Sequence, residues 1–325
     1  MAGIYIDGKK VKGAFLAGQK VNAFLNSQLL FNEPIYLAVG NDTAGNVVII
    51  KSADGITWQQ VQHNIPAESV SAVFCFKNKF VINLANSTYV SWQAKQFNYR
   101  RFAYNEFMNL CDNYDIGVKY LVCATGGYIY GYSKDGVIWT QNNSSLIGRN
   151  LIYFAGKYRF DTPDGNSQKE LTDLALNDVV ASPQIINGIP IVCNFASGRK
   201  LLWLNSWNNP VYYTIEEEDG TLTQYQNTPV FYYGGVIYGF SGDRFWLSQT
   251  DHQFNTFYTS TDGINWTTVS LPLIKKWLIP FWDGEKYICM QDDEILVSYN
   301  GINFSQVSKT LTGVTWKGIV SNVIQ

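Results

Sequence analysis

Histidine and charged side chains are scarce in this chain, and their scarcity argues against several classes of function. Only His63 and His252 occur, far apart, and none of the five cysteines forms a Cys-x-x-Cys pair. We therefore expect no zinc site, no other metal and no cofactor. Charged residues make up 15% of the chain and the formal net charge is −2, which predicts neither nucleic acid nor an anionic membrane as partner. No apolar run approaches the roughly 20 residues of a transmembrane helix, so we expect no membrane insertion.

The cysteines give no sign of a disulfide framework. They are odd in number, widely scattered and mostly set among apolar, strand-like residues (Cys75, Cys111, Cys123, Cys193 and Cys289). This pattern predicts free, buried thiols in a protein made in a reducing compartment. The first residues, Met1 to Lys9, lack the basic start and apolar core of a signal peptide. We therefore expect synthesis in a host cytoplasm.

A turn motif recurs along the chain. It reads Ser-x-Asp-Gly-x-x-aromatic, with good copies at residues 52–58, 133–139, 260–266 and 298–304, the last with Asn300 and Phe304 at the Asp and aromatic positions. Asp-Gly and Asn-Gly suit hairpin turns because both central residues can adopt positive φ. The Ser and Asp side chains can also bond the amides of the turn. Weaker copies at 91–97 and 206–212 fit only a relaxed pattern.

The spacing of these motifs predicts a repeat of about 40 residues. Successive starts differ by 39, 42, 73, 54 and 38 residues, and the gap of 73 leaves room for one further unit with its turn at Thr162–Gly165. Seven units of this length are typical of a propeller with four-stranded blades. We predict an all-β fold, a single seven-bladed β-propeller over residues 35–325, with six blades as the alternative.

A second pattern, strand, tight turn and strand, precedes most motifs. It occurs at residues 73–82, 151–160, 185–192, 230–238 and 279–288, and less cleanly at 114–123. The first unit, from Ile35, lacks its opening strand, whereas residues 314–320 form an opening strand with no unit after it. We therefore predict that the C-terminal strand completes the first blade and removes an open edge. Helix signals are nearly absent, apart from one short candidate at 171–178.

Residues 1–34 have a shorter repeat of their own. Ile4–Val11 is followed ten residues later by Ala14–Val21, and Ala23–Leu30 is a weaker third copy. Each copy has an apolar pair, a turn and a returning strand, at a period too short to build a separate core. We expect this segment to mediate attachment or oligomerisation, with packing on the propeller as the alternative.

The turn motif resembles the Asp-box of sialidase-type propellers, although it is one residue shorter than the commonest form. Asp-boxes are structural elements of the outer rim, so the resemblance implies a scaffold role for their conserved positions, here Ser52, Asp54, Trp58, Ser133, Asp135, Trp139, Ser260, Asp262, Trp266, Ser298, Asn300 and Phe304. The N-terminal repeat resembles short segments of tailed-bacteriophage tail and fibre proteins. Together these resemblances imply a virion protein present in several copies, with other virion proteins bound through residues 1–34.

Catalytic signatures are weak. A sialidase needs three converging arginines, but the chain has only six in all and lacks the Phe/Tyr-Arg-Ile-Pro signature. The acidic stretches at Glu216–Gly220 and Asp292–Glu294 are interpreted as solvated turns, the second with no calcium-loop spacing. A Ser-His-Asp triad would depend on one of two isolated histidines. We therefore predict no catalytic residues and a protein that is not an enzyme. The sequence does not exclude the paired catalytic carboxylates of another class of glycosidase.

Aromatic residues beside amides and carboxylates are the side chains that carbohydrate binding needs. Such groupings lie near predicted turns, and we select as tentative ligand-binding residues Trp203, Trp207, Asn208, Trp246 and Trp282. The alternative is that these rings pack between blades. The favoured function is a tail-associated receptor-binding or fibre protein that recognises a host surface glycan. The alternatives are a structural virion component, such as a head or tail decoration or connector, and a glycan-cleaving enzyme.

Overall fold

The computed structural model describes strands throughout the chain and the turns that join many of them. It describes residues 5–6, 9–10, 14–16, 19–25, 28–31, 34–76, 79–85, 87–92, 94, 96–100, 107–113, 115, 118–125, 128–134, 140–141, 149–161, 168–171, 180–181, 189–204, 212–226, 236–249, 256–270, 278–291 and 293–322. Every element in these ranges is a β-strand. The described residues contain no helix that is long and apolar enough to cross a membrane. The candidate helix at 171–178 falls largely outside them.

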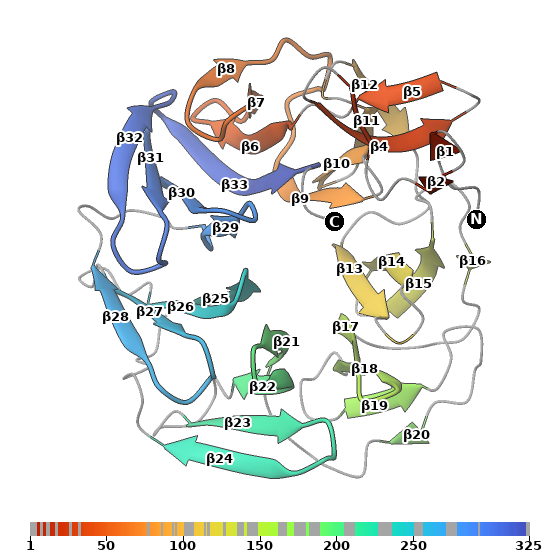
Figure 1. The fold of residues 1–325 in the computed structure, drawn as a ribbon, viewed down its shortest axis with the longest axis vertical. Coiled ribbons are helices and arrows are strands. Elements are labelled where there is room, and N and C mark those ends of the chain that lie inside the picture. The colour runs from red at the N-terminus through yellow and green to blue at the C-terminus, as the bar shows by residue number, and fades with distance from the viewer. Residues whose placement is uncertain are drawn as a thin grey trace.

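Figure 1 shows the chain as a ring of small antiparallel sheets. In the part of the chain that the structure describes, seven sheets have four strands each. The first contains β33 (Val314–Ser321), β6 (Tyr36–Asp42), β7 (Val47–Ser52) and β8 (Trp58–Gln60). The second contains β9 (Val70–Phe76), β10 (Lys79–Leu84), β11 (Thr88–Trp92) and β12 (Gln96–Arg100). The third contains β13 (Phe107–Asn113), β14 (Val118–Thr125), β15 (Tyr128–Ser133) and β16 (Thr140–Gln141).

The remaining four sheets follow the same order along the chain. The fourth contains β17 (Arg149–Phe154), β18 (Lys157–Asp161), β19 (Gln168–Leu171) and β20 (Val180–Ala181). The fifth contains β21 (Ile189–Phe195), β22 (Gly198–Leu204), β23 (Tyr212–Glu217) and β24 (Leu222–Gln226). The sixth contains β25 (Val236–Ser241), β26 (Arg244–Gln249), β27 (Thr256–Ser260) and β28 (Thr267–Ser270). The last contains β29 (Phe281–Trp282), β30 (Tyr287–Gln291), β31 (Glu294–Ser298) and β32 (Ser305–Lys309).

The first strand of each sheet lies nearest the centre of the ring (Figure 1). Contacts between these innermost strands run from β33 to β9 and onward through β13, β17, β21 and β25. Strand β33 pairs antiparallel with β6, from Val314 opposite Asp42 to Ser321 opposite Tyr36. The last described strand therefore completes the sheet that β6 begins, which confirms the pairing expected from residues 314–320.

In the first sheet the core lies on both faces, against the two neighbouring sheets. In β6, Leu37 and Val39 pack with Val73 and Phe80 of the second sheet. The alternate residues of β6, Tyr36 and Ala38, pack instead against a group from the last sheet that includes Ile288, Met290 and Ile295. Side chains alternate across a strand, so both alternating sets must be apolar. This explains the abundance of apolar and aromatic residues in the sequence.

Two of the predicted strand–turn–strand units are described only in part, because residues 185–188 and 230–235 lie outside the described residues. Residues 189–192 belong to β21, and residues 236–238 open β25. The turns that join the first two strands of these sheets lie farther along, at residues 196–197 and 242–243. The weak motif at 206–212 is misplaced, because it spans the connection from β22 to β23 and not a turn from a third to a fourth strand. The turn at Thr162–Gly165 lies outside the described residues.

Residues 1–34 form sheets that are separate from the ring of four-stranded sheets. Strands β1 (Tyr5–Ile6) and β2 (Lys9–Lys10) pair with each other, and β3 (Ala14–Leu16), β4 (Gln19–Leu25) and β5 (Gln28–Phe31) form a three-stranded sheet. The pairs Tyr5 with Lys10 and Phe15 with Lys20 occupy the same positions of the sequence repeat. The backbone therefore repeats one short hairpin, as the sequence predicts.

Candidate functional site

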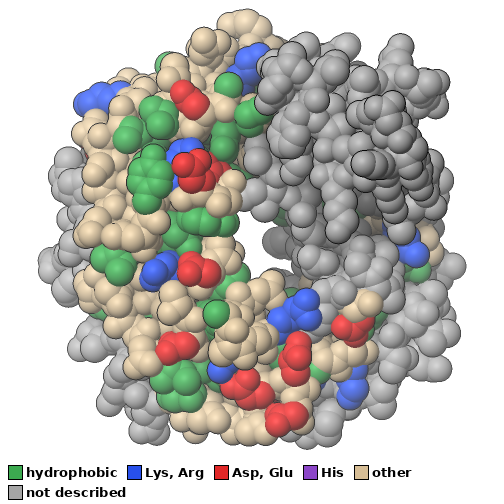
Figure 2. Space-filling model, in the orientation of Figure 1, with side chains coloured by type: hydrophobic (Ala, Val, Ile, Leu, Met, Phe, Trp, Pro, Cys, Tyr) green, Lys and Arg blue, Asp and Glu red, His purple; other side chains and the backbone are tan. Residues whose placement is uncertain are grey.

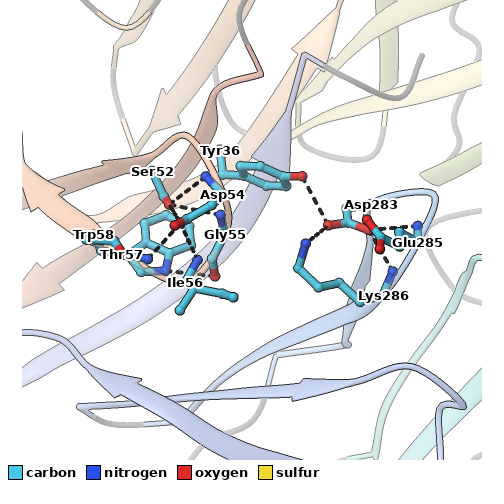
Figure 3. A network of polar contacts seen from close by, with 10 residues as sticks. All are labelled: Tyr36, Ser52, Asp54, Gly55, Ile56, Thr57, Trp58, Asp283, Glu285 and Lys286. Atoms are coloured by element: carbon cyan, nitrogen blue, oxygen red, sulfur yellow. Dashed lines mark hydrogen bonds and ion pairs between the residues drawn. The ribbon is translucent and has the colours of Figure 1, made fainter.

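The turn between β7 and β8 is held by hydrogen bonds from its own side chains (Figure 3). The Ser52 hydroxyl donates to Asp54 Oδ1 over 2.8 Å and accepts from the backbone N–H of Gly55 over 2.9 Å. Asp54 Oδ1 also accepts from the N–H groups of Ile56 and Thr57, at 2.8 and 2.7 Å. Burial opposes ionisation of Asp54, but these hydrogen bonds outweigh it and lower its pKa to about 2. The carboxylate is therefore a fixed acceptor within the turn.

The same hydrogen bonds occur in two other copies of the motif. Asp262 accepts from Ser260 and from the N–H groups of Ile264 and Asn265. Asn300 Oδ1 accepts from Ser298 over 3.1 Å and from Ile302 and Asn303 at 2.9 Å each. A neutral amide therefore performs the same role as the carboxylate. In the remaining copy, Ser133 is buried, and Asp135 and Trp139 lie outside the described residues.

Each of these turns packs on the sheet that precedes its own in the ring. A Cβ atom on Gly55 would clash with Ile288 Cδ1 of the last sheet, and one on Gly301 would lie 2.6 Å from Arg244 Nε of the sixth sheet. Gly263 faces Ile215 and Phe195 of the fifth sheet. Gly55 also has φ of 74°, a conformation that side chains with a Cβ rarely adopt. The turns are therefore part of the contact between neighbouring sheets.

A tyrosine and an aspartate form a second contact between the first and last sheets (Figure 3). The Tyr36 hydroxyl donates to Asp283 Oδ2 over 3.0 Å, and Lys286 Nζ lies 2.7 Å from the same oxygen. Asp283 Oδ1 accepts from the N–H groups of Glu285 and Lys286. Burial opposes ionisation of Asp283, but the bonds from Lys286 and Glu285 outweigh it and lower its pKa. Burial, and then the charge of Asp283, raise the pKa of Tyr36.

The same kind of contact recurs between the sixth and last sheets. The Tyr287 hydroxyl donates to Asp243 Oδ1 over 2.5 Å. Arg244 Nε lies 3.5 Å from the same oxygen, and the Asp243 side chain is 66% exposed. The half-buried Trp282 ring lies with its centroid 4.5 Å from that of Tyr287, and the backbone N–H of Trp282 donates to Ser241 Oγ over 2.8 Å. A third such bond, from Tyr153 to Asp115, joins the third and fourth sheets.

These contacts form a continuous polar and aromatic strip across three sheets. We call the group formed by Asp243, Arg244, Trp282, Asp283, Glu285, Lys286, Tyr287 and Tyr36 the junction strip; Asp243 and Glu285 are exposed, Arg244 and Trp282 are partly exposed, and the other four residues are buried. Within it, Asp283 has donors on both oxygens and its side chain is 2% exposed, so it cannot act as a base toward a bound molecule. Asp243 and Glu285 are exposed, so these carboxylates can accept hydrogen bonds from a ligand.

Charges of opposite sign lie close together over the described surface. Figure 2 shows one face of the ring, hollowed at its centre, with acidic and basic side chains next to one another around the hollow. The described ion pairs include Lys200 with Glu217 at 2.9 Å and Arg199 with Glu218 at 3.8 Å. No group of three or more histidine, cysteine or acidic side chains in the described ranges is placed to hold a metal ion.

The structure places the tentative ligand-binding residues very differently from one another. Trp203 is 1% exposed and Trp246 is 0% exposed. Trp203 Nε1 donates to Glu216 Oε2, and the Trp246 ring packs edge-on to Tyr287. A sugar ring cannot stack on either side chain, so these two predictions are wrong. Trp207 and Asn208 lie outside the described residues. Trp282 alone among the described three reaches the surface.

The acidic stretch at residues 216–220 is also different from its interpretation as a solvated turn. Glu216 lies in β23 with 2% of its side chain exposed, and its carboxylate is 2.5 Å from Arg159 of the fourth sheet. Only residues 218–219 form the turn proper. The ion pair contributes to the contact between the fourth and fifth sheets. At the second acidic stretch, Asp293 lies 3.8 Å from Lys309, and Asp292 lies outside the described residues.

Two of the cysteines are buried thiols, as the sequence predicts, and a third is not fully buried. Cys193 and Cys289 are both 0% exposed, whereas Cys75 is partly exposed. Burial raises the pKa of Cys289 to about 12, and its sulfur lies 3.6 Å from the carbonyl oxygen of Leu278. Neither thiol contributes to the junction strip.

Sequence reasoning missed most of the junction strip. The local signal for it is a Tyr that opens the second strand of a sheet when the preceding sheet has an Asp in its first turn, as with Tyr36 and Asp283. At the sixth sheet the equivalent position is Phe245, and the first turn of the fifth sheet consists of Ala196 and Ser197, so neither partner of the pair is present there. This correspondence becomes visible only when the sheets are aligned in ring order.

Solved structures with the same architecture are β-propeller proteins. No protein-family model and no curated protein sequence matches the chain. Virginiamycin B lyase from Staphylococcus aureus matches 74% of this chain and 84% of its own, with a TM-score of 0.52 and 14% identity. A streptogramin B lyase covers 84% and 97%, with a TM-score of 0.50 and 12% identity. Hydrazine synthase from Kuenenia stuttgartiensis covers 84% and 92%, with a TM-score of 0.53 and 12% identity.

These likenesses establish the β-propeller fold and correct one prediction. Identities of 12 to 14% support a common architecture and nothing finer. The prediction that the chain is not an enzyme is wrong in so far as it rests on the fold. Two of these three propellers are lyases, so the β-propeller fold does not exclude catalysis. At such low identity they show the fold alone and carry no argument about catalysis by this chain. None of these three names is that of a phage protein, so a phage origin stays a prediction.

Proposed function

We propose that this chain is a seven-bladed β-propeller of a tailed-bacteriophage virion that recognises a host surface glycan. In this proposal each four-stranded sheet is one blade, and residues 1–34 attach the ring to other virion proteins in a multi-copy assembly. Support for the blade count comes from the seven four-stranded sheets of the described residues. Support for the attachment role comes from the short hairpins of residues 1–34, which are separate from the ring.

The observation that carries glycan recognition is the surface position of Trp282. Its ring packs on Tyr287, and its backbone is fixed by the bond from its main-chain N–H to Ser241 Oγ. Asp243 and Arg244 follow directly after the Gly242 position, where an added Cβ would lie 2.8 Å from the Trp282 ring. An aromatic face beside a carboxylate and a guanidinium can stack on a sugar ring while its hydroxyl groups are hydrogen bonded. A rigid scaffold holds these groups in place without a cost of ordering on binding.

The test is binding of the full chain to an array of bacterial polysaccharides, followed by analysis of the bound glycans for cleavage. We expect retention on some glycans, and we expect Trp282→Ala to weaken it about tenfold or more. Trp266→Ala is the matched control, because Trp266 is also half-buried but packs against Tyr213 and Phe245 away from the strip. Equal loss in both variants, or no binding to any glycan, would overturn the proposal. Released oligosaccharides would identify a glycan-cleaving activity at the same surface.

A further inference from the structure

The charges around Trp282 limit which glycan the junction strip can accept. The strip contains three carboxylates, Asp243, Asp283 and Glu285, and two cations, Arg244 and Lys286. Arg244 lies 3.5 Å from Asp243, and Lys286 lies 2.7 Å from Asp283. Both cations are therefore already neutralised by a carboxylate of the strip, and Lys286 has only 10% of its side chain exposed.

An acidic sugar would be a poor ligand for this surface. Its carboxylate would need to displace Asp243 from Arg244 or Asp283 from Lys286, which would leave a protein carboxylate without its cation. Asp283 also accepts hydrogen bonds from Tyr36 and from two backbone N–H groups. Displacing it would break the contact between the first and last sheets.

Glu285 is the carboxylate of the strip that remains available. Its side chain is exposed, three residues from Trp282 along the same turn, and it forms no ion pair within the described part of the chain. Its backbone N–H is fixed by Asp283 over 2.8 Å, so the position of the residue is defined. Asp243, in the sixth sheet, is also exposed, but it already accepts from Tyr287 and lies 3.5 Å from Arg244.

We infer that the junction strip selects a glycan with a positively charged amino sugar. The sugar ring would stack on Trp282, and its ammonium group would bind Glu285. This inference rests on the proposed glycan recognition and adds the charge class of the ligand. It depends on the exposed Glu285 carboxylate and the aromatic ring together, because neither would bind a sugar specifically by itself.

The test compares oligosaccharides of equal length that differ in charge. Calorimetry or biolayer interferometry would measure binding of the full chain to glucosamine, N-acetylglucosamine and galacturonate hexamers. We expect the amine form to bind about two- to fivefold more tightly than the acetylated form at low salt, which is the range for an exposed ion pair. This preference should disappear at high salt.

Two variants separate the inference from the proposed function. Glu285→Gln should abolish the preference for the amine form, whereas Asp219→Asn, an exposed carboxylate in a turn of the fifth sheet, should leave it unchanged. Trp282→Ala should weaken binding of both forms. Trp282-dependent binding with equal affinity for both forms, or tighter binding of the galacturonate form, would overturn the inference and leave glycan recognition standing. Loss of all Trp282-dependent binding to every glycan would overturn both.

Discussion

Tyr36 and Asp283 are 247 positions apart in the chain, yet the Tyr36 hydroxyl donates a hydrogen bond to the Asp283 carboxylate over 3.0 Å. The bond joins the first sheet to the last and lies beside the pairing of β33 with β6. Removing the hydroxyl in Tyr36→Phe should lower the free energy of unfolding by about 1 to 2 kcal/mol, because Asp283 is buried and loses a donor. Urea denaturation would measure this loss.

Tyr36→Phe can be checked against a second variant. Asp283→Ala and the double variant complete a double-mutant cycle for the pair. We expect a coupling energy of about 0.5 to 1.5 kcal/mol between the two side chains. A coupling energy near zero would show that the hydrogen bond does not stabilise the contact between the sheets.

The turn at Ser52–Trp58 gives a prediction about acid stability. The pKa of Asp54 is lowered from 3.8 to about 2 in the folded protein. A lowered folded pKa contributes stability above the unfolded value, and this contribution is lost as the pH falls from 3.8 towards 2. Asp54→Asn should therefore unfold with a weaker dependence on pH in this window than the unaltered chain, measured by circular dichroism.

Asp54→Ala tests the hydrogen bonds themselves. The alanine would leave the N–H groups of Ile56 and Thr57 without the acceptor that Asp54 provides, at a cost of about 1 to 3 kcal/mol. Asp54→Asn should cost less than about 1 kcal/mol at neutral pH, because Asn300 already performs this role in the last sheet. Equal losses for the two variants would contradict this account of the turn.

Alanine variants of Gly55 and Gly45 distinguish the energetic cost of a strained backbone from that of a steric clash. Both have positive φ, at 74° and 84°. A Cβ on Gly45 would meet nothing within 4 Å, whereas one on Gly55 would clash with Ile288 Cδ1. Gly45→Ala should cost about 1 kcal/mol for its backbone conformation alone, and Gly55→Ala should cost clearly more. Thermal unfolding of the two variants would reveal whether the turn packs on the last sheet as tightly as its geometry indicates.

The buried ion pair between Arg159 and Glu216 should contribute far more to the free energy of unfolding than the more exposed pair of Lys200 with Glu217. Glu216→Gln leaves the Arg159 charge without its buried partner, and we expect a loss of about 3 to 5 kcal/mol. Glu217→Gln removes a carboxylate that is 41% exposed and pairs with Lys200, which should cost less than about 1 kcal/mol. Similar losses in the two variants would show that burial does not determine the strength of these pairs.

Local patterns in the sequence predicted the fold better than they predicted the surface. Alternating apolar residues, Asp-Gly turns and the unmatched strand at 314–320 are short-range signals, and the β-propeller fold and the pairing of β33 with β6 follow from them. Turn composition did not point to every turn. The turns that join the first two described strands of the sixth and fifth sheets lie at residues 242–243 and 196–197, and the sequence patterns predict neither of them.

The candidate site could not be predicted in the same way. Trp203, Trp246 and Trp282 all stand beside polar residues near predicted turns, and only the packing of neighbouring sheets decides which ring is buried. Tyr36 and Tyr287 resemble ordinary core residues until the Asp of the preceding sheet is placed opposite them. Contacts between sheets join distant parts of the chain, so no local window of the sequence contains both partners.

The closing pair of strands gives the ring a directional response to mechanical load. Strands β6 and β33 are antiparallel, and the Ile35 N–H donates to Asn322 Oδ1 over 2.8 Å at the shared end of the pair. Pulling residues 35 and 322 apart would peel the two strands, breaking their bonds one after another. A force that enters at residue 35 and leaves through another sheet would instead load β6 along its length, against β33 and β7 together. The ring therefore opens easily under one geometry of traction and resists the other.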